Sequence, residues 1–288
     1  MFKKTKRFLG CALAACGIFA CAGTLTACET NNPEVEMKIE FNGETYVLDY
    51  KLYRKITPNT VNHFLWLADG GFYNDTVIHD YDAEALKMYG GLYAYNTEEG
   101  GDYYVDKSYA AFCEKYADKF PKSVFLDKGE TPIYTVYGEF KDNQFNVTSG
   151  LLKEDFGTLS MYYHQKDTDS RVYVKRADGK GYADRAYEYN SATSMFYMTL
   201  SSGAKTQNAY CTFATLKGDS KATLESFVQA ITDYIEEKYD EDATRFVTAT
   251  EMHIDAEDEI ENSQDKKATF DIPNEPIIIK YVKVKKYW

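Results

Sequence analysis

Alternation of apolar and polar residues is the clearest pattern near the start of the folded region, in MKIEFNGETYVLDYKLY (residues 37–53). A period of two is typical of a strand that buries one face. Asn42 and Gly43 interrupt the alternation, and both residue types tolerate the positive φ that a tight hairpin turn needs. This segment therefore predicts a β-hairpin.

Two later segments place apolar residues at helical spacing. In the first, Thr57 suits the N-cap, Pro58 suits the first turn, and Gly70 and Gly71 mark the end. The second begins after Asp219. The apolar positions are Val61, Phe64, Leu65 and Ala68 in the first helix and Leu224, Phe227, Val228, Ile231 and Ile235 in the second. Short strand-like segments lie between and after them, which predicts a mostly β barrel or sandwich with helical caps.

The first 28 residues differ from the rest of the chain. MFKKTKR supplies four positive charges, and no charged residue follows until Glu29. This pattern predicts an export signal over residues 1–27. LTAC (residues 25–28) resembles a bacterial lipobox, so we expect lipidation at Cys28. LAAC (residues 13–16) fits the same pattern at Cys16, but cleavage there would leave an apolar segment at the new N-terminus. An uncleaved membrane anchor is the other alternative.

On each of these interpretations the folded part lies outside the cytoplasm and is attached to the membrane. We expect residues 28–36 to be a tether and residues 37–288 to be one domain. Without the leader, 29 Lys and Arg face 45 Asp and Glu, a net charge of about −16. Such a surface repels nucleic acid and anionic lipid headgroups, so attachment must come from acyl chains.

Two cysteines remain after the leader, Cys113 and Cys211. Outside the cytoplasm they could form a disulfide. Two buried thiols are the alternative that we expect, and sequence alone does not decide between them. A charge-rich stretch, DAEDEIENSQDKK (residues 255–267), predicts a loop to which we assign no binding function.

Six segments occur in the order and approximate spacing of one known family. They are ITPNTVNHFLWLADGGFYNDTVIHD, YGEFKDNQF, GTLSM, NSATSMFYMTL, AYCTFATLKGD and EPIIIKYVKV. Residues 37–288 thereby resemble the cyclophilins, a family of peptidyl-prolyl isomerases. The resemblance implies an eight-stranded antiparallel β-barrel capped by two α-helices. It also implies a groove on the outer face that binds proline-containing peptides, with no cofactor and no metal.

Two segments depart from a minimal cyclophilin. The first spans about residues 92–132 and contains an apparent helix, DKSYAAFCEKYADKF. The second spans about residues 164–189 and is expected to be a polar, charge-rich loop. Both would flank the groove in the family's topology. They would therefore either cover or extend the groove, or decorate the surface.

Prolyl isomerisation requires no nucleophile, base or metal ion. Rotation about a peptide C–N bond costs about 18–20 kcal/mol, because the bond has partial double-bond character. A catalyst must hold the proline and favour the twisted amide. In cyclophilins, the arginine that directly follows a histidine donates a hydrogen bond towards the prolyl nitrogen. Arginine suits this role because it is always charged and only donates.

In this chain the histidine is retained as His79, but Asp80 stands at the arginine position. An ionised aspartate only accepts hydrogen bonds, so no catalytic residue is intact and the site is lost or rebuilt. We expect His79 to be structural. A metal site at His79, Asp80 and Asp82 is disfavoured, because adjacent strand residues face opposite sides and no second histidine is near. We expect His253 to be solvated.

Other groove positions also depart from the family's residues, and tyrosine is the commonest replacement. They are Leu86, Tyr89, Tyr162, Tyr163, Met195, Tyr197, Lys205, Thr206 and Tyr210. Tyrosines of this kind are common at recognition surfaces. The alternative is that several of these rings pack against the two insertions.

Two functions remain open. The first is a membrane-anchored isomerase that acts on exported proteins, with reduced activity because of Asp80. The second is a non-catalytic module that binds peptides or proteins on the same scaffold. The distinguishing feature is whether a cation reaches the groove, and Lys87 and Lys205 are the candidates.

Overall fold

The computed structural model describes residues 31–96, 104–118, 120, 122–143, 151–163, 171–176, 179–187, 190, 192–206, 208–253 and 267–287. The predicted leader and both candidate lipidation sites, Cys16 and Cys28, lie outside these residues. Within the described part of the chain, no helix combines the length and apolar character needed to cross a bilayer.

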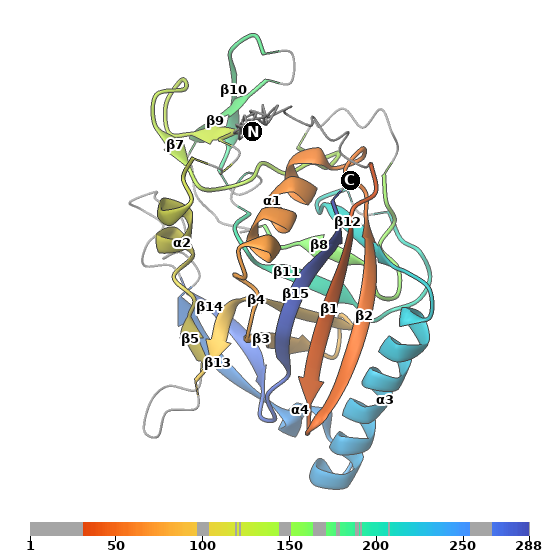
Figure 1. The fold of residues 1–288 in the computed structure, drawn as a ribbon. Helices are drawn as coiled ribbons and strands as arrows, with labels where there is room; N and C mark the ends of the chain where they lie inside the picture. Colours follow the sequence, from red (N-terminus) through yellow and green to blue (C-terminus); the bar gives the residue numbers. More distant parts are fainter. Residues whose placement is uncertain are drawn as a thin grey trace, which may run out of the picture.

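Eight antiparallel strands form a closed barrel (Figure 1). Their order is β11-β8-β12-β2-β1-β15-β3-β4, and β11 pairs with β4 to close the ring. The strands are β1 (Glu34–Phe41), β2 (Glu44–Leu52), β3 (Thr76–Asp82), β4 (Lys87–Tyr95), β8 (Leu159–Met161), β11 (Phe196–Thr199), β12 (Thr212–Leu216) and β15 (Ile278–Lys286). This arrangement confirms the predicted fold class.

The first hairpin, β1–β2, forms as predicted. Asn42 and Gly43 form its turn with φ of 47° and 81°, and Phe41 pairs with Glu44. The apolar positions of β1 alternate into the barrel core, where Val35 and Met37 are fully buried. The period of two in the sequence therefore identified the buried face correctly.

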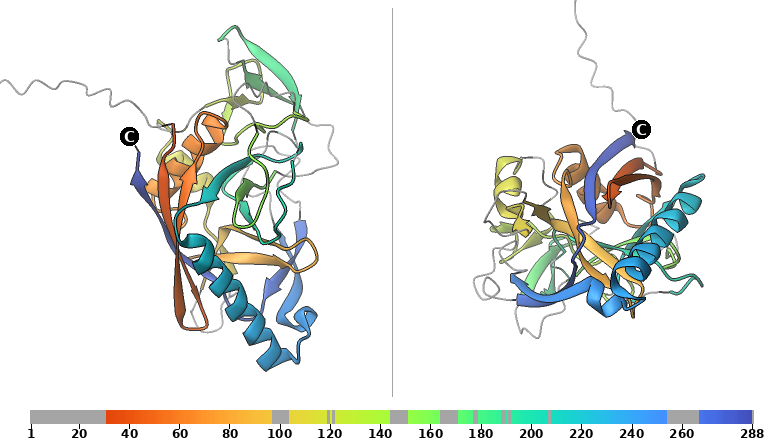
Figure 2. Two further views of the ribbon diagram at one scale, coloured as in Figure 1. Left: turned by 90° about the vertical axis from the view of Figure 1, so that its right-hand side faces the viewer. Right: turned by 90° about the horizontal axis from the view of Figure 1, so that it is seen from below.

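The two predicted helices are α1 (Pro58–Asp69) and α3 (Ser220–Tyr239). Figures 1 and 2 show them toward opposite ends of the barrel. Thr57 is the N-cap residue of α1, as predicted, but its side chain makes no capping hydrogen bond. Instead, the buried Glu139 carboxylate accepts the N–H groups of Asn59 at 3.0 Å and Thr60 at 2.9 Å. A carboxylate there complements the positive end of the helix dipole.

The two predicted insertions pair with each other. The first contributes β5 (Tyr104–Asp106), α2 (Tyr109–Lys115), β6 (Val124–Phe125) and β7 (Pro132–Ile133), and the second contributes β9 (Arg171–Lys175) and β10 (Tyr182–Ala186). A four-stranded sheet has the order β10-β9-β6-β7, with Val124 opposite Val174. The second insertion is therefore not only a polar loop, since Val172, Val174 and Ile133 form a small buried cluster.

A further hairpin lies between α3 and β15, where the sequence pattern had predicted only a loop. After α4 (Ala243–Phe246), β13 (Val247–His253) pairs with β14 (Lys267–Pro273). This hairpin is separate from the barrel sheet, and β14 lies beside β3. The predicted loop at residues 255–267 falls outside the described residues except for Lys267, the first residue of β14.

Cys113 and Cys211 are both buried as thiols, which confirms the expectation for these two residues. The Cys211 sulfur lies 3.3 Å from the Thr60 hydroxyl, next to the start of α1. Burial raises the pKa of the Cys211 thiol well above its ordinary value, because the thiolate would be poorly solvated there.

Candidate functional site

A β-bulge in β3 decides how His79 and Asp80 are oriented. Ile78 pairs with Gly90 and Asp80 pairs with Tyr89, so His79 is the extra residue. Ile78 and Tyr81 consequently both pack in the barrel core, while His79 and Asp80 both face outward to the β13–β14 hairpin. The expectation that His79 and Asp80 face opposite sides is therefore wrong.

His79 is a buried residue between two aromatic rings. Its ring centroid lies 5.0 Å from that of Tyr93 and 4.9 Å from that of Phe270, both edge to face. Burial lowers the pKa of His79 to about 3, with the Val77 carbonyl opposing the shift. The imidazole is thus neutral at ordinary pH and packs as an apolar group. Among the described residues, no three His, Cys, Asp or Glu side chains gather as a metal site would require.

Asp80 forms a hydrogen bond with the β14 strand of the β13–β14 hairpin. Its Oδ1 accepts the backbone N–H of Asp271, in β14, at 3.0 Å. The pKa of Asp80 is raised to about 6, mainly by burial and to a smaller extent by the Asp271 and Asp82 carboxylates, whereas the hydrogen bond from the Asp271 N–H opposes the shift. The residue that the sequence predicts at the family's arginine position therefore accepts a hydrogen bond from the backbone of this chain.

Apolar contacts complete the attachment of this hairpin. Phe270 and Ile272 from β14 are buried against Val77, Leu92 and the fully buried Met195. The hairpin thus covers His79 and Met195, two of the residues predicted to line the groove. Neither Phe270 nor Asp271 was identified from sequence, although the alternation in KATFDIP (residues 267–273) is a strand signal.

Four of the predicted groove tyrosines lie together: Tyr89 on β4, Tyr197 on β11, Tyr162 directly after β8 and Tyr210 shortly before β12. Tyr197 is fully buried and pairs in register with Tyr89, and their ring centroids are 5.3 Å apart. Tyr210 meets the Tyr197 ring edge to face at 5.6 Å, and Tyr162 meets the Tyr89 ring at 5.9 Å. Tyr89, Tyr162, Tyr197 and Tyr210 are called the tyrosine cluster below.

A buried ion pair lies beside the tyrosine cluster. The Lys87 Nζ is 3.0 Å from Glu154 Oε1, and the two side chains are only 15% and 4% exposed. The same ammonium lies 4.1 Å from the ring centroid of Tyr197 and 5.4 Å from that of Tyr210. Glu154 also accepts the Thr199 hydroxyl at 3.0 Å. Lys87 was a candidate cation from sequence, but its partner Glu154 was not identified.

The other predicted groove residues do not join this arrangement. Leu86 lies in the turn between β3 and β4 with a φ of 54° and is 44% exposed. Lys205 and Thr206 are exposed, and the backbone of Lys205 pairs with that of Glu154. Tyr163 faces the barrel core instead, where its ring packs against Phe140.

The model of the family "Cyclophilin type peptidyl-prolyl cis-trans isomerase/CLD" matches residues 36–253 of the chain. The chain belongs to the cyclophilin family. No curated protein sequence matches this cyclophilin.

Solved structures of a cyclophilin-type peptidyl-prolyl cis-trans isomerase from Cryptosporidium parvum are similar to the chain. One is 18% identical, with a TM-score of 0.42, over 89% of this chain and 99% of that chain. The other, in the presence of the dipeptide Ala-Pro, is 16% identical, with a TM-score of 0.42, over 88% of this chain and 99% of that chain.

The charged residues Asp80 and Lys87 of the predicted groove both have partners within the chain. The carboxylate of Asp80, which the family resemblance places at the arginine position, accepts a hydrogen bond from the β13–β14 hairpin, and the same hairpin covers its neighbour His79. Among the described contacts, Lys87 supplies the cation beside the tyrosine cluster, and Glu154 neutralises its charge. The partly exposed tyrosine edges offer apolar faces with polar tips, which suit contact with a peptide.

Proposed function

We propose that this cyclophilin is a peptide-binding protein that binds proline-containing segments of exported proteins with little prolyl isomerase turnover. It is held at the extracytoplasmic side of a bacterial membrane by lipid on Cys28. The observation that carries the proposal is the hydrogen bond from the Asp271 N–H to Asp80. The carboxylate at the catalytic position cannot donate to a prolyl nitrogen, and it already binds the chain's own backbone.

Electrostatics argue against efficient turnover. The twisted amide gathers electron density on its nitrogen, which a cation stabilises and a carboxylate opposes. Asp80 lies beside Asp82 and Asp271, whose charges help to raise its pKa. Lys87 already pairs with a buried carboxylate, so its charge is compensated before any peptide arrives.

Binding is supported by the tyrosine cluster. Tyr89, Tyr162 and Tyr210 are half-buried, so each ring packs against its neighbours and still reaches solvent at one edge. Rigid aromatic rings contribute contact area at low entropic cost, and proline stacks well on them. The Lys87 ammonium, held by Glu154, packs against the ring of Tyr197 in the same cluster.

The test follows cis–trans exchange of a proline tetrapeptide by NMR with the full chain in a neutral detergent. We expect peptide line broadening that reports binding, without acceleration of exchange. An acceleration of cis–trans exchange comparable to that by an arginine-bearing cyclophilin would contradict the proposal. Replacement of a half-buried ring, as in Tyr162→Ala, should weaken binding, whereas replacement of the exposed Leu86 by Ala should not.

A gain-of-function pair sharpens the same test. Asp80→Arg alone removes the acceptor for Asp271 but leaves Phe270 packed on His79. Asp80→Arg combined with Phe270→Ala supplies the cation and loosens the hairpin. We expect only the double variant to accelerate exchange. Acceleration by Asp80→Arg alone would show that the hairpin does not limit access.

Anchoring is tested separately in a bacterial host. The mature protein should carry acyl chains on Cys28 and sediment with membranes, and Cys28→Ser should abolish both properties. Cys16→Ser is the matched control and should leave both unchanged. Acylation that persists in Cys28→Ser and disappears in Cys16→Ser would assign the anchor to the other cysteine.

A further inference from the structure

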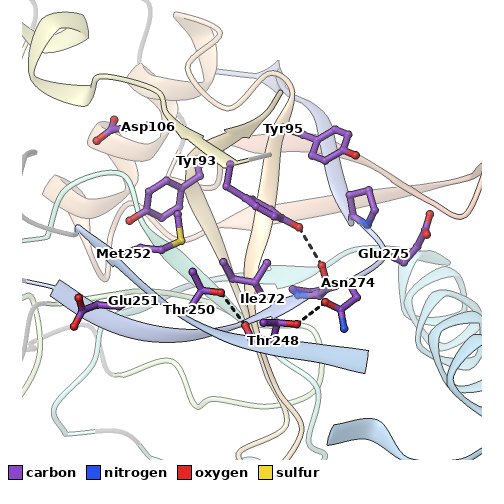
Figure 3. A pocket seen from close by; sticks show the side chains of 13 residues that line it. Tyr93, Tyr95, Asp106, Thr248, Thr250, Glu251, Met252, Ile272, Asn274 and Glu275 are labelled. Atoms are coloured by element: carbon purple, nitrogen blue, oxygen red, sulfur yellow. Dashed lines mark hydrogen bonds between the residues drawn. The ribbon is translucent and has the colours of Figure 1, made fainter. Parts of the chain in front are cut away.

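A cavity lies between the β4–β5 edge of the barrel sheet and the β13–β14 hairpin (Figure 3). Its volume is about 950 Å³, within the range of ligand-binding pockets in proteins. Tyr93, Tyr104 and Asp106 line it from the sheet, and Thr250 and Met252 line it from the hairpin. Neither β5 nor the hairpin belongs to the eight barrel strands, so this cavity arises from segments added to the barrel.

Tyrosine rings and apolar side chains form much of the lining. Tyr93, Tyr95 and Tyr104 contribute rings, and Met252 and Ile272 contribute aliphatic or thioether surface. The Tyr104 hydroxyl donates to the Pro273 carbonyl at 3.1 Å and so connects the two sides. These contacts define the shape of the cavity before a ligand binds.

The charged residues of the lining all carry the same sign. They are Asp106, Glu251 and Glu275, and the described lining includes no lysine, arginine or histidine. Figure 3 shows Asp106 and Glu251 on one side of the cavity and Glu275 on the other. The pKa of Tyr104 is raised to about 12, mainly by burial and to a smaller extent by the neighbouring Tyr95 and Glu275. The field of Glu275 therefore reaches into the cavity.

Two of these carboxylates, Asp106 and Glu275, retain acceptor capacity for a ligand. Asp106 accepts the Ser108 N–H through Oδ1, and Glu275 accepts the Tyr234 hydroxyl at 3.1 Å through Oε2. Glu251 pairs with Lys267 at 2.9 Å, but both side chains are well exposed, so this pair exchanges readily with another cation. A carboxylate has about four lone-pair sites, so one bond does not exhaust it.

We propose that this cavity binds a basic peptide segment, in which two lysine or arginine side chains flank an apolar one. The cationic groups meet the carboxylates on the two sides of the cavity, and the apolar side chain packs among the tyrosine rings. Tyrosine faces also attract ammonium and guanidinium groups. The site is distinct from the tyrosine cluster and does not depend on proline, so it goes beyond the proposed function.

The separation of the carboxylates favours a peptide over a single small cation. A lone ammonium would satisfy one side and leave most of a 950 Å³ cavity to solvent. A segment with two cationic side chains and an apolar one between them spans both sides and fills the apolar middle. The net charge of −12 for the whole chain adds long-range attraction for such a segment and disfavours acidic ones.

The experiment uses the full chain in a zwitterionic detergent with ¹³C-methyl methionine labelling. Met252 lines the cavity, and with seven methionines in the chain its methyl signal is assigned by its loss in Met252→Leu. The probe is acetyl-Lys-Leu-Lys-amide, and acetyl-Glu-Leu-Glu-amide is the charge-reversed control. We expect saturable shifts of the Met252 signal with the basic peptide only.

Matched variants test the carboxylates. Asp106→Asn with Glu275→Gln keeps the hydrogen-bond acceptors and removes two charges, and we expect about tenfold weaker binding of the basic peptide. Glu225→Gln with Glu237→Gln removes two charges from exposed positions of α3 and should change binding less than about twofold. Equal weakening in both double variants, an equal response to both peptides, or no shift at Met252 overturns the proposal. The probe lacks proline, so none of these outcomes decides the isomerase question.

Discussion

The two faces of β4 and β11 follow different rules. Facing inward, Met88, Phe196 and Met198 join the buried core that the barrel needs. Facing outward, the same strands present Lys87, Tyr89 and Tyr197. Because strand residues alternate between faces, the core can keep the fold while the outer face acquires another role. Preservation of the fold by residues on one face of these strands therefore does not require preservation of particular residues on the other face.

The largest effect on this outer face should come from the buried ion pair. Lys87→Met removes the cation from the 4% exposed Glu154 carboxylate, and we expect a loss of about 3–5 kcal/mol in the free energy of unfolding. Chemical denaturation measures this change. Lys267→Met breaks an exposed pair with Glu251 and should cost less than about 1 kcal/mol. Equal losses would mean that burial does not distinguish the two pairs.

A smaller loss is expected where the hairpin packs on the barrel. Phe270→Ala removes a buried ring from His79 and should lower the free energy of unfolding by about 3 kcal/mol. It should also admit water to His79, whose pKa of about 3 would rise toward its ordinary 6.5. An NMR pH titration of the imidazole measures that rise. Thr269→Ala, on the exposed face of β14, is the control, and a titration unchanged in Phe270→Ala would contradict the packing role.

A change of about 1 kcal/mol should separate charge from hydrogen bonding at Asp80. The pKa of Asp80 is raised from its ordinary 3.8 to about 6, so this group contributes stability at low pH that is lost as pH rises through 6. Asp80→Asn keeps an acceptor for Asp271 without the charge. Relative to the unmodified chain, it should gain on the order of 1 kcal/mol between pH 4 and 7, after allowance for solvent screening.

The pH dependence of Asp80→Asn is measured by denaturation at several pH values. Asp80→Ala is the companion variant, because it removes the acceptor together with the charge. We expect it to be less stable than Asp80→Asn at every pH, since the Asp271 N–H loses its partner. A flat difference between the unmodified chain and Asp80→Asn would exclude an unfavourable charge at this position.

The smallest effect is expected at the other candidate lysine. Lys205 is exposed, and its recorded contacts are backbone hydrogen bonds to Glu154. Lys205→Met should therefore change the free energy of unfolding by less than about 0.5 kcal/mol. It should also leave binding of a proline tetrapeptide unchanged. A loss of binding in Lys205→Met alone would place the functional cation on the loop, outside the ion pair.

The sequence predicted those parts of the molecule whose pattern is local. The turn at Asn42 and Gly43, and the apolar stripe of α1, follow from spacing within a few residues. Glu139 as the partner of the α1 N-terminus could not be predicted this way, because it lies 80 residues from Asn59 in the chain. A side-chain hydrogen bond across such a distance leaves no periodic signal.

The candidate site could be predicted only in part, because some of its features also leave no simple pattern in the sequence. Register in β4 and β11 brings Tyr89 and Tyr197 together, and the family motifs place both strands. The outward turn of His79 depends on a bulge, and a single extra residue shifts every later side chain to the other face. The β14 strand was missed because its apolar residues, Phe270 and Ile272, follow a charge-rich stretch that resembles a loop.

The pairing of β6 with β9 makes the two insertions dependent on each other. Removal of either one would expose an unpaired strand edge and open the cluster around Val124 and Val174. An engineered minimal version of this protein would therefore have to delete both segments together. The same coupling means that an ancestral chain carrying only one of them would have needed another way to protect that edge from aggregation.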